Sequence, residues 1–215
     1  MGLADLLNAT LLTVAGTPVT WVEFLGFASG VGNVWLVARQ NIWNWPIGIL
    51  NVSLYLLIFA DSGLYADSAL QLVYLALAVY GWWAWLHGGT NRTPLPVSRT
   101  TRRTWLWLLP AGVMVTAGLT LLLDRATDSN VPFWDALTTT LSLMATYGQT
   151  RKLLESWWLW IIADLVYVPL YLYKDLWLTA VLYVIFLSLC VLGLRNWSRD
   201  LSLAVRMRLT EAGAR

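Results

Sequence analysis

Charged side chains are scarce in this sequence. Only 12% of its 215 residues are Asp, Glu, Lys or Arg, and 58% are hydrophobic, whereas a typical soluble domain has about 25% charged residues. This composition excludes an ordinary soluble globular domain. It predicts an integral membrane protein, so the lipid bilayer is its first expected partner.

Residues that could build a catalytic or metal centre are equally few. The sequence has one cysteine, Cys190, and one histidine, His87, which excludes an internal disulfide and a cysteine metal cluster. Intramembrane proteases and transferases need paired aspartates, a Ser-His pair or a metal cluster, and only Asp164 falls in mid-span. No G-x-x-x-x-G-K-[ST] nucleotide motif occurs. We therefore expect a protein that is not an enzyme and uses no metal or other cofactor.

Hydrophobic stretches that could cross a bilayer follow one another along the chain. A spanning helix needs about 20 mostly apolar residues, and seven such stretches lie between charged residues: 23–39, 39–61, 67–86, 103–124, 135–151, 157–173 and 175–195. The first and fifth are short, so we expect Glu23 and Asp135 to lie at the membrane interface. Residues 1–20 contain no Lys or Arg and hence no basic secretory leader. We interpret them as a short amphipathic lead-in.

Positive charge falls almost entirely on one side of the predicted membrane. If the first span runs from outside to inside, only Arg125 and Lys174 of the 14 Lys and Arg residues lie outside. Because positively charged loops stay in the cytoplasm, we expect an outside N-terminus and a cytoplasmic C-terminus. The basic tail at 198–215 is expected either to be solvated there or to lie along the anionic inner leaflet.

An internal repeat is visible when the chain is shifted by 112 residues. The shift pairs Arg39 with Arg151, Trp45 with Trp157, Gly81 with Gly193, and Trp85 with Trp197. Chance similarity between Trp- and Leu-rich helices is the alternative to a duplication. A duplication divides the chain into a first three-helix repeat (21–88), a cytoplasmic basic loop (89–103), a linker helix (104–124) and a second repeat (133–197). Parallel repeats of this kind are typical of transporters that bind substrate between the repeats.

Polar side chains recur inside the predicted spans at helical spacing. They are Asn51 with Tyr55, Gln71 with Tyr74, and Asp164 with Tyr167, while Tyr183 occupies the repeat position of Gln71. An unsatisfied polar group in hydrocarbon costs several kcal/mol, so these groups either hydrogen-bond across the bundle or line a cavity. Trp, Tyr, amide and carboxylate groups together suit a flat, hydroxylated ligand, and an ionised Asp164 also suits a cationic one.

Four stretches of sequence resemble the PnuC family of bacterial vitamin transporters. They are WNWPIGILN, LYADSALQLVYLALAVYGWWAW, TTLSLMATY and WLWIIADLVYVPLYLYKDLWLTAVLYVIF, and the resemblance covers about residues 23–197. It implies an all-α fold of seven transmembrane helices in a 3+1+3, SWEET-like arrangement, in the bacterial cytoplasmic (inner) membrane, assembled as a homotrimer. It also implies facilitated diffusion of an unphosphorylated vitamin that a cytosolic kinase traps, with no nucleic-acid partner.

The resemblance, together with the polar positions, predicts a substrate site. Its residues are Trp45, Asn51, Tyr55, Gln71, Tyr74, Asp164, Tyr167 and Tyr183. One departure from the family pattern is Ser156, which stands where we expect an Asn before the tryptophan that opens the sixth span. Nicotinamide riboside is the expected cargo because of the WNWP and YGWW segments. Thiamine and riboflavin are the alternatives, a non-transporting scaffold or sensor is a more distant one, and proton coupling through Asp164 is the alternative to simple facilitation.

Overall fold

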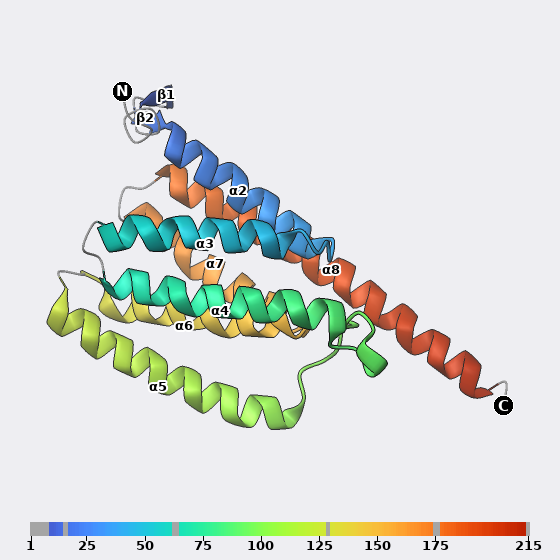
Figure 1. Ribbon diagram of the computed structural model, residues 1–215. Coiled ribbons are helices and arrows are strands. Elements are labelled where there is room, and N and C mark those ends of the chain that lie inside the picture. Colours follow the sequence, from blue (N-terminus) through green and yellow to red (C-terminus); the bar gives the residue numbers. More distant parts are fainter. Residues whose placement is uncertain (1–8, 15–16, 62–64, 128–129, 174–176, 214–215) are drawn as a thin grey trace.

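Helices make up most of the computed structural model, which describes residues 9–14, 17–61, 65–127, 130–173 and 177–213 (Figure 1). Seven α-helices lie in these ranges: α2 (Trp21–Ala38), α3 (Asn44–Asp61), α4 (Tyr65–His87), α5 (Arg102–Ala126), α6 (Pro132–Thr150), α7 (Ser156–Tyr173) and α8 (Trp177–Gly213). A short 3-10 helix, η1 (Thr90–Arg92), follows α4. Each of the seven hydrophobic stretches seen in the sequence contributes one α-helix.

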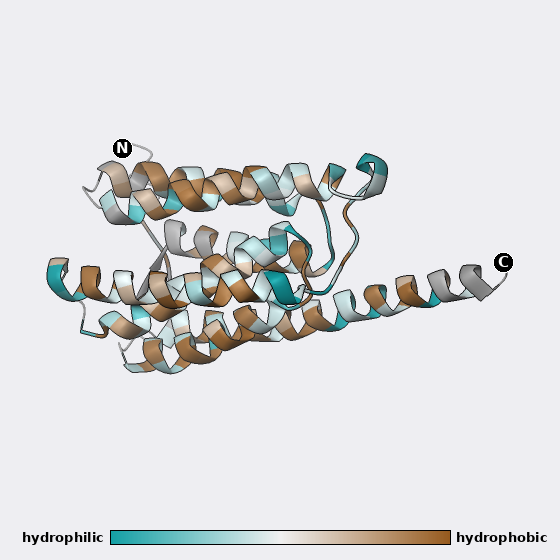
Figure 2. Cartoon of the chain, turned by 90° about the horizontal axis from the view of Figure 1, so that it is seen from below, coloured by the Kyte–Doolittle hydropathy of each residue, from teal (hydrophilic) through white to brown (hydrophobic). Residues whose placement is uncertain are grey.

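Hydrophobic residues run along the helices, and hydrophilic ones gather toward helix ends and loops (Figure 2). Four segments are long and apolar enough to cross a membrane: Asp67–His87, Arg102–Ala126, Ser156–Tyr173 and Thr179–Met207. The apolar part of α2, Phe27–Ala38, is shorter. The helical membrane protein expected from composition is therefore confirmed.

Helix α6 has buried hydroxyl groups that it satisfies within itself. The Oγ1 atom of Thr138 donates to the Trp134 carbonyl at 2.9 Å, and Oγ1 of Thr140 donates to the Ala136 carbonyl at 2.9 Å. Such bonds to the preceding turn let threonine enter an apolar helix without leaving its hydroxyl unpaired. They explain how a threonine-rich segment can lie inside the bundle.

Two short strands precede α2, and they correct the prediction of an all-α chain. Strand β1 (Thr10–Val14) pairs antiparallel with β2 (Thr17–Thr20), with Val14 opposite Thr17. The segment is rich in Thr and Val, whose β-branched side chains favour strands over helices. The lead-in expected at 1–20 is thus a hairpin over its second half, and residues 1–8 lie outside the described residues.

The loops between α2 and α3, α4 and α5, and α6 and α7 lie at the same end of the bundle (Figure 1). We call it the basic end, because its loops contain Arg39, Arg92, Arg99, Arg151 and Lys152. The segment before α5 is attached to the α6–α7 loop by backbone hydrogen bonds. Ser98 N donates to the Lys152 carbonyl at 3.0 Å, and Leu154 N donates to the Ser98 carbonyl at 2.9 Å.

Four tryptophans form the core next to the basic end. Trp45 and Trp85 meet edge to face with ring centroids 5.3 Å apart, and Trp157 and Trp197 do so at 5.4 Å. The two pairs join through Trp85 and Trp197, whose centroids are 6.0 Å apart. Because the pairs are related by the shift of 112 residues, the sequence repeat has a counterpart in side-chain packing.

Hydrogen bonds and glycines of this core follow the same shift. Trp85 Nε1 donates to the Gln149 carbonyl at 2.8 Å, and Trp197 Nε1 donates to the Val37 carbonyl at 3.2 Å. A Cβ atom placed on Gly81 would lie 2.3 Å from the Trp45 ring, and one on Gly193 would lie 2.4 Å from the Trp157 ring. Each glycine therefore lets a tryptophan lie directly against a neighbouring helix backbone.

Helix α8 continues well past the tryptophan core. Its 37 residues correspond to about 55 Å at 1.5 Å per residue, and its last part extends away from the other helices (Figure 1). The basic tail expected at 198–215 is, as far as Gly213, the end of this helix.

Candidate functional site

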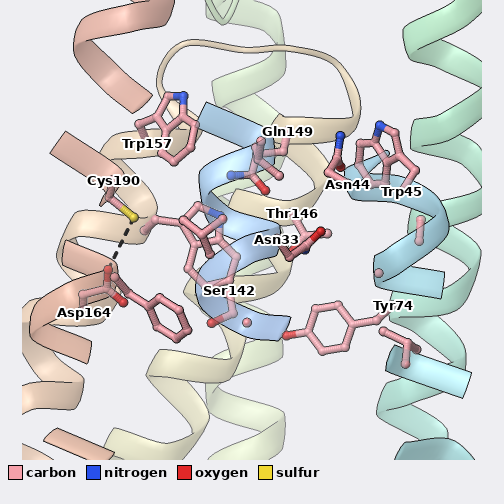
Figure 3. A pocket seen from close by; sticks show the side chains of 18 of the residues that line it. Asn33, Asn44, Trp45, Tyr74, Ser142, Thr146, Gln149, Trp157, Asp164 and Cys190 are labelled. Atoms are coloured by element: carbon pink, nitrogen blue, oxygen red, sulfur yellow. Dashed lines mark hydrogen bonds between the residues drawn. The ribbon is translucent and has the colours of Figure 1, made fainter. Parts of the chain in front are cut away.

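A cavity of about 390 Å³ lies between α2, α3, α4, α6, α7 and α8, within the volume range of small-molecule sites. Figure 3 shows side chains from these helices converging on it. Its described polar lining consists of Asn33, Asn44, Tyr74, Ser142, Thr146, Gln149, Asp164, Tyr167 and Tyr183. Aromatic walls are added by Trp45, Trp157, Trp160 and Phe186.

The lining follows helical periodicity. In α7 it is Trp157, Trp160, Asp164 and Tyr167, and in α8 it is Tyr183, Phe186 and Cys190. Residues three and four apart share one face of a helix, so each helix presents a single stripe to the cavity. The stripe of α3 is Asn44, Trp45, Gly48 and Val52.

Five of the eight residues predicted for the substrate site lie in this lining. They are Trp45, Tyr74, Asp164, Tyr167 and Tyr183. Trp45 comes from the start of α3 near the basic end, whereas Tyr167 and Tyr183 come from α7 and α8 farther from it. The structure thus brings together aromatic and polar groups that are up to 138 positions apart in the sequence.

The other three residues are not part of the cavity wall. Asn51 lies next to Val52 but contacts α2, where its Nδ2 donates to Ser29 Oγ at 3.4 Å. Tyr55 packs on the ring of Phe59, with centroids 5.7 Å apart. Gln71 is half-buried in α4, one turn before Tyr74 and beyond the lining. These three residues therefore lie outside the described lining. The sequence does not reveal how far each helix stripe extends along the cavity.

Asn33 and Asn44 line the cavity and were not predicted for it. Asn44 is buried and its Nδ2 donates to the Asn41 carbonyl at 2.6 Å. Its repeat counterpart is Ser156, also buried, whose Oγ donates to the Leu153 carbonyl at 2.7 Å. Ser156, which stands where an Asn was expected, therefore makes the same kind of hydrogen bond to the preceding loop as Asn44 does. The repeat alignment could have pointed to Asn44. Of this pair of equivalent positions, only Asn44 lines the cavity.

Asp164 is the only charged residue in the described lining. Its side chain is 1% exposed, and Sγ of Cys190 donates to its Oδ2 at 3.4 Å. Cys190 belongs to the buried core and also lines the cavity. No Lys, Arg or His is found among the described lining residues, so the protein offers the Asp164 carboxylate no countercharge there.

Four buried polar atoms of the lining have no hydrogen-bond partner in the described part of the chain. They are the Nε1 atoms of Trp45, Trp157 and Trp160 and the Oδ1 atom of Asn33. An unsatisfied buried donor or acceptor costs about 1–3 kcal/mol, and native proteins leave few of them. Three indole donors and one amide acceptor of the lining residues are thus buried without a partner among the described residues.

A tyrosine cluster lies at the end of the cavity away from the basic end. The rings of Tyr167 and Tyr183 are 4.5 Å apart, and Tyr171 stacks on Tyr183 at 5.0 Å. Phe186 meets Tyr183 edge to face at 5.5 Å. Aromatic layers therefore bound the cavity at both ends, tryptophans at one and tyrosines at the other.

Comparison with known proteins bears directly on this arrangement. Residues 20–199 match the nicotinamide mononucleotide transporter family. The chain belongs to this family. The resemblance to bacterial vitamin transporters seen in the motifs is therefore confirmed, and the similar proteins are named as transporters.

Individual members of the family are similar over most of their length. The nicotinamide riboside transporter PnuC of Escherichia coli (strain K12) is 26% identical over 211 residues, covering 85% of this chain and 87% of the relative. The riboflavin/roseoflavin transporter RibM of Streptomyces davaonensis is 28% identical over 195 residues, covering 89% and 91%. A crystal structure of the vitamin B3 transporter PnuC matches with a TM-score of 0.64 and 26% identity, covering 85% of this chain and 82% of that one.

Proposed function

We propose that this protein carries nicotinamide riboside across a bacterial cytoplasmic membrane by facilitated diffusion, after which a cytosolic kinase traps the vitamin. The observation that carries the proposal is the cavity of aromatic, amide and carboxylate groups between the helices of a chain from this transporter family. Nicotinamide riboside joins a flat cationic ring to a sugar rich in hydroxyl groups. Aromatic faces attract such a ring, and indole and amide groups orient such hydroxyls.

The binding residues that we propose are the five predicted residues of the lining together with the unsatisfied groups beside them. The predicted residues are Trp45, Tyr74, Asp164, Tyr167 and Tyr183, and the added ones are Asn33, Trp157 and Trp160. The indole donors lie toward the basic end of the cavity. They suit the oxygens of the ribose, since each would satisfy a donor that the protein leaves unpaired.

An unphosphorylated cargo fits the charges of the cavity better than a nucleotide does. Phosphate groups are bound by Arg, Lys or helix N-termini, and the described lining contains no cationic side chain. A phosphate would instead share the cavity with the Asp164 carboxylate. The riboside without its phosphate avoids this repulsion.

Riboflavin is the second candidate, because RibM, a riboflavin/roseoflavin transporter, is 28% identical to this chain. Riboflavin has a neutral ring system and offers nothing to balance Asp164. Thiamine, a cation, meets that requirement and belongs in the same test.

The proposed arrangement is two parallel three-helix repeats, 21–88 and 133–197, joined by α5 in a SWEET-like 3+1+3 order. The tryptophan, glycine and hydrogen-bond pairs at a shift of 112 residues support it. Basic residues at one end of the bundle support an outside N-terminus and a cytoplasmic C-terminus. A homotrimer is proposed from the family resemblance, and the mass of the purified protein in detergent tests it.

Uptake by proteoliposomes that hold the purified protein tests the function. We expect labelled nicotinamide riboside to equilibrate without accumulating, at a rate that a protonophore leaves unchanged. Coencapsulated nicotinamide riboside kinase and ATP should then convert equilibration into accumulation. Protein-free liposomes and excess unlabelled riboflavin, thiamine and nicotinamide mononucleotide are the controls. Absence of uptake for every vitamin would contradict transport, and concentrative, uncoupler-sensitive uptake would contradict facilitation.

A further inference from the structure

We infer that Asp164 makes this cavity selective for ligands whose aromatic ring carries a positive charge. The inference rests on the proposed function and deepens it. It assigns the choice between cationic and neutral vitamins to one carboxylate in the middle of α7.

Asp164 is buried inside the helix bundle. The side chain is 1% exposed in a helix apolar enough to cross a membrane, where an ionised carboxylate is costly without a partner of opposite charge. Lys152, the buried cation at the basic end, instead donates to Gln40 and lies over the Trp85 ring. A ligand cation is therefore the countercharge that the described cavity lacks.

Two aromatic residues flank Asp164 along α7. Trp160 and Tyr167 lie one turn before and one turn after it on the same stripe of α7, and all three line the cavity. Aromatic faces attract cations through the electron density of the ring. The carboxylate and the rings therefore favour the same ligand charge.

Cys190 supports this role by occupying only part of the carboxylate. Its Sγ donates to Oδ2 of Asp164 at 3.4 Å, and a thiol is a weak donor. The carboxylate keeps most of its capacity to interact with a ligand. The thiol orients the side chain without neutralising it.

A pair of ligands that differ in charge but hardly in shape tests the inference. Nicotinamide riboside has a cationic ring, and its dihydro form has the same sugar with a neutral ring. Binding of both to the purified full-length protein is measured by calorimetry. We expect the wild type to prefer the cation by at least about tenfold, Asp164→Asn to lose most of this preference by weakening the cation alone, and Asp164→Glu to keep it.

Asp124→Asn is the matched control, since it removes an exposed carboxylate near the end of α5 and should leave the preference unchanged. An equal preference in wild type and Asp164→Asn overturns the inference, and so does a wild type that binds the neutral form more tightly. If Asp164→Asn does not fold, the wild type and Asp164→Glu decide. Failure of the wild type to bind either form overturns the proposed function itself.

A separate observation at the basic end carries a second inference. We propose that Gln40 and Lys152 form a latch that closes this end of the cavity. The two residues occupy equivalent positions in the α2–α3 and α6–α7 loops and share a left-handed backbone, with φ of 53° and 48°. Nζ of Lys152 donates to Oε1 of Gln40 at 3.1 Å, and Nε2 of Gln40 donates to Oδ2 of Asp200 on α8 at 2.6 Å.

The latch lies next to the tryptophans at the basic end of the cavity. Nζ of Lys152 lies 4.4 Å from the Trp85 ring centroid, and Trp85 packs edge to face on Trp45, which lines the cavity. In this proposal the way out at the basic end lies between the α2–α3 and α6–α7 loops, which the hydrogen bond joins. The bond therefore has to break during transport toward this end.

The single cysteine of the chain provides the test, because Cys190 lines the cavity. A membrane-impermeant thiol reagent is added to right-side-out and to inside-out vesicles, and the rate at which Cys190 is modified is measured. We expect Lys152→Met and Gln40→Leu to raise the rate several-fold from the side of the basic end only. Arg151→Gln, which removes the neighbouring cation and its bond to Tyr80, is the control and should leave the rate unchanged.

Rates that stay at the wild-type value in both latch variants overturn the second inference. An equal increase from both sides also overturns it, because that result indicates general loosening. If substitution of the buried Lys152 prevents folding, Asp200→Asn takes its place. It changes the exposed residue that accepts the Gln40 hydrogen bond and should likewise raise the rate from the side of the basic end.

Discussion

Lys152 donates a hydrogen bond from Nζ to Oε1 of Gln40 at 3.1 Å, and the two residues are 112 positions apart. The interval is that of the sequence repeat. The bond therefore joins equivalent positions of the two halves of the chain, where one half has an amide and the other a cation.

The buried position of Lys152 makes stability depend on pH. Loss of water on burial lowers the pKa of Lys152 from its ordinary 10.5 to about 8, and the Asp200 carboxylate partly opposes this effect. Since the unfolded chain holds the proton more tightly than the folded one, stability rises as pH rises from about 8 to about 10.5. We expect the melting temperature of the wild type to increase over this window relative to that of Lys152→Met. Melting temperatures that change equally with pH in the two proteins would refute this.

The glycines that face tryptophans should tolerate no side chain. Gly81→Ala and Gly193→Ala would place a Cβ 2.3 Å and 2.4 Å from the rings of Trp45 and Trp157. Overpacking of this kind costs about 1–3 kcal/mol. We expect each variant to lower the melting temperature in detergent by several degrees. Gly118→Ala has nothing within 4 Å of the new Cβ and should be neutral or slightly stabilising. Equal effects at the three positions would contradict the close packing.

Removing an unsatisfied indole donor should lower the affinity for the ligand more than it lowers the stability of the ligand-free protein. Nε1 of Trp160 is buried without a partner, so Trp160→Phe deletes a cost of the empty cavity. A ligand hydrogen bond contributes about 0.5–1.5 kcal/mol, which corresponds to a roughly two- to tenfold weaker Kd for nicotinamide riboside.

Trp85→Phe is the comparison for Trp160→Phe, because Nε1 of Trp85 donates to the Gln149 carbonyl. This variant should lose stability, since it removes the indole bond to the Gln149 carbonyl, which then accepts only from backbone N–H groups such as that of Lys152. Calorimetric titration and melting curves of both variants separate the two effects. A Trp160→Phe variant with unchanged affinity would show that its indole does not contact the ligand.

Ligand occupancy should protect Cys190 from modification. Cys190 is the only cysteine and lines the cavity, so a bound ligand blocks the path of a small membrane-permeant thiol reagent. We expect nicotinamide riboside to slow modification of the wild type in a concentration-dependent way that follows its Kd. Cys190→Ala should not react at all. A modification rate that is independent of ligand would place the binding site elsewhere.

The helical membrane fold was determined by the sequence itself. Spanning a bilayer needs about 20 apolar residues, and a chain that is 58% hydrophobic with few charges places its helices between those charges. The repeat was visible for a similar reason, because tryptophan and glycine recur where a ring packs on a backbone. The hairpin of β1 and β2 was missed although its Thr- and Val-rich composition favours strands.

The composition of the cavity was decided by the tertiary structure. Trp45, Tyr74 and Asp164 line the cavity, whereas Asn51 and Gln71 lie outside its described lining, although all are polar or aromatic groups in apolar helices. These helices are hydrophobic on nearly every side, so periodicity alone cannot distinguish the stripe that faces the cavity from the faces that meet lipid or another helix. That choice depends on how each helix is rotated and how far it slides along its neighbours, which only packing across the whole bundle determines.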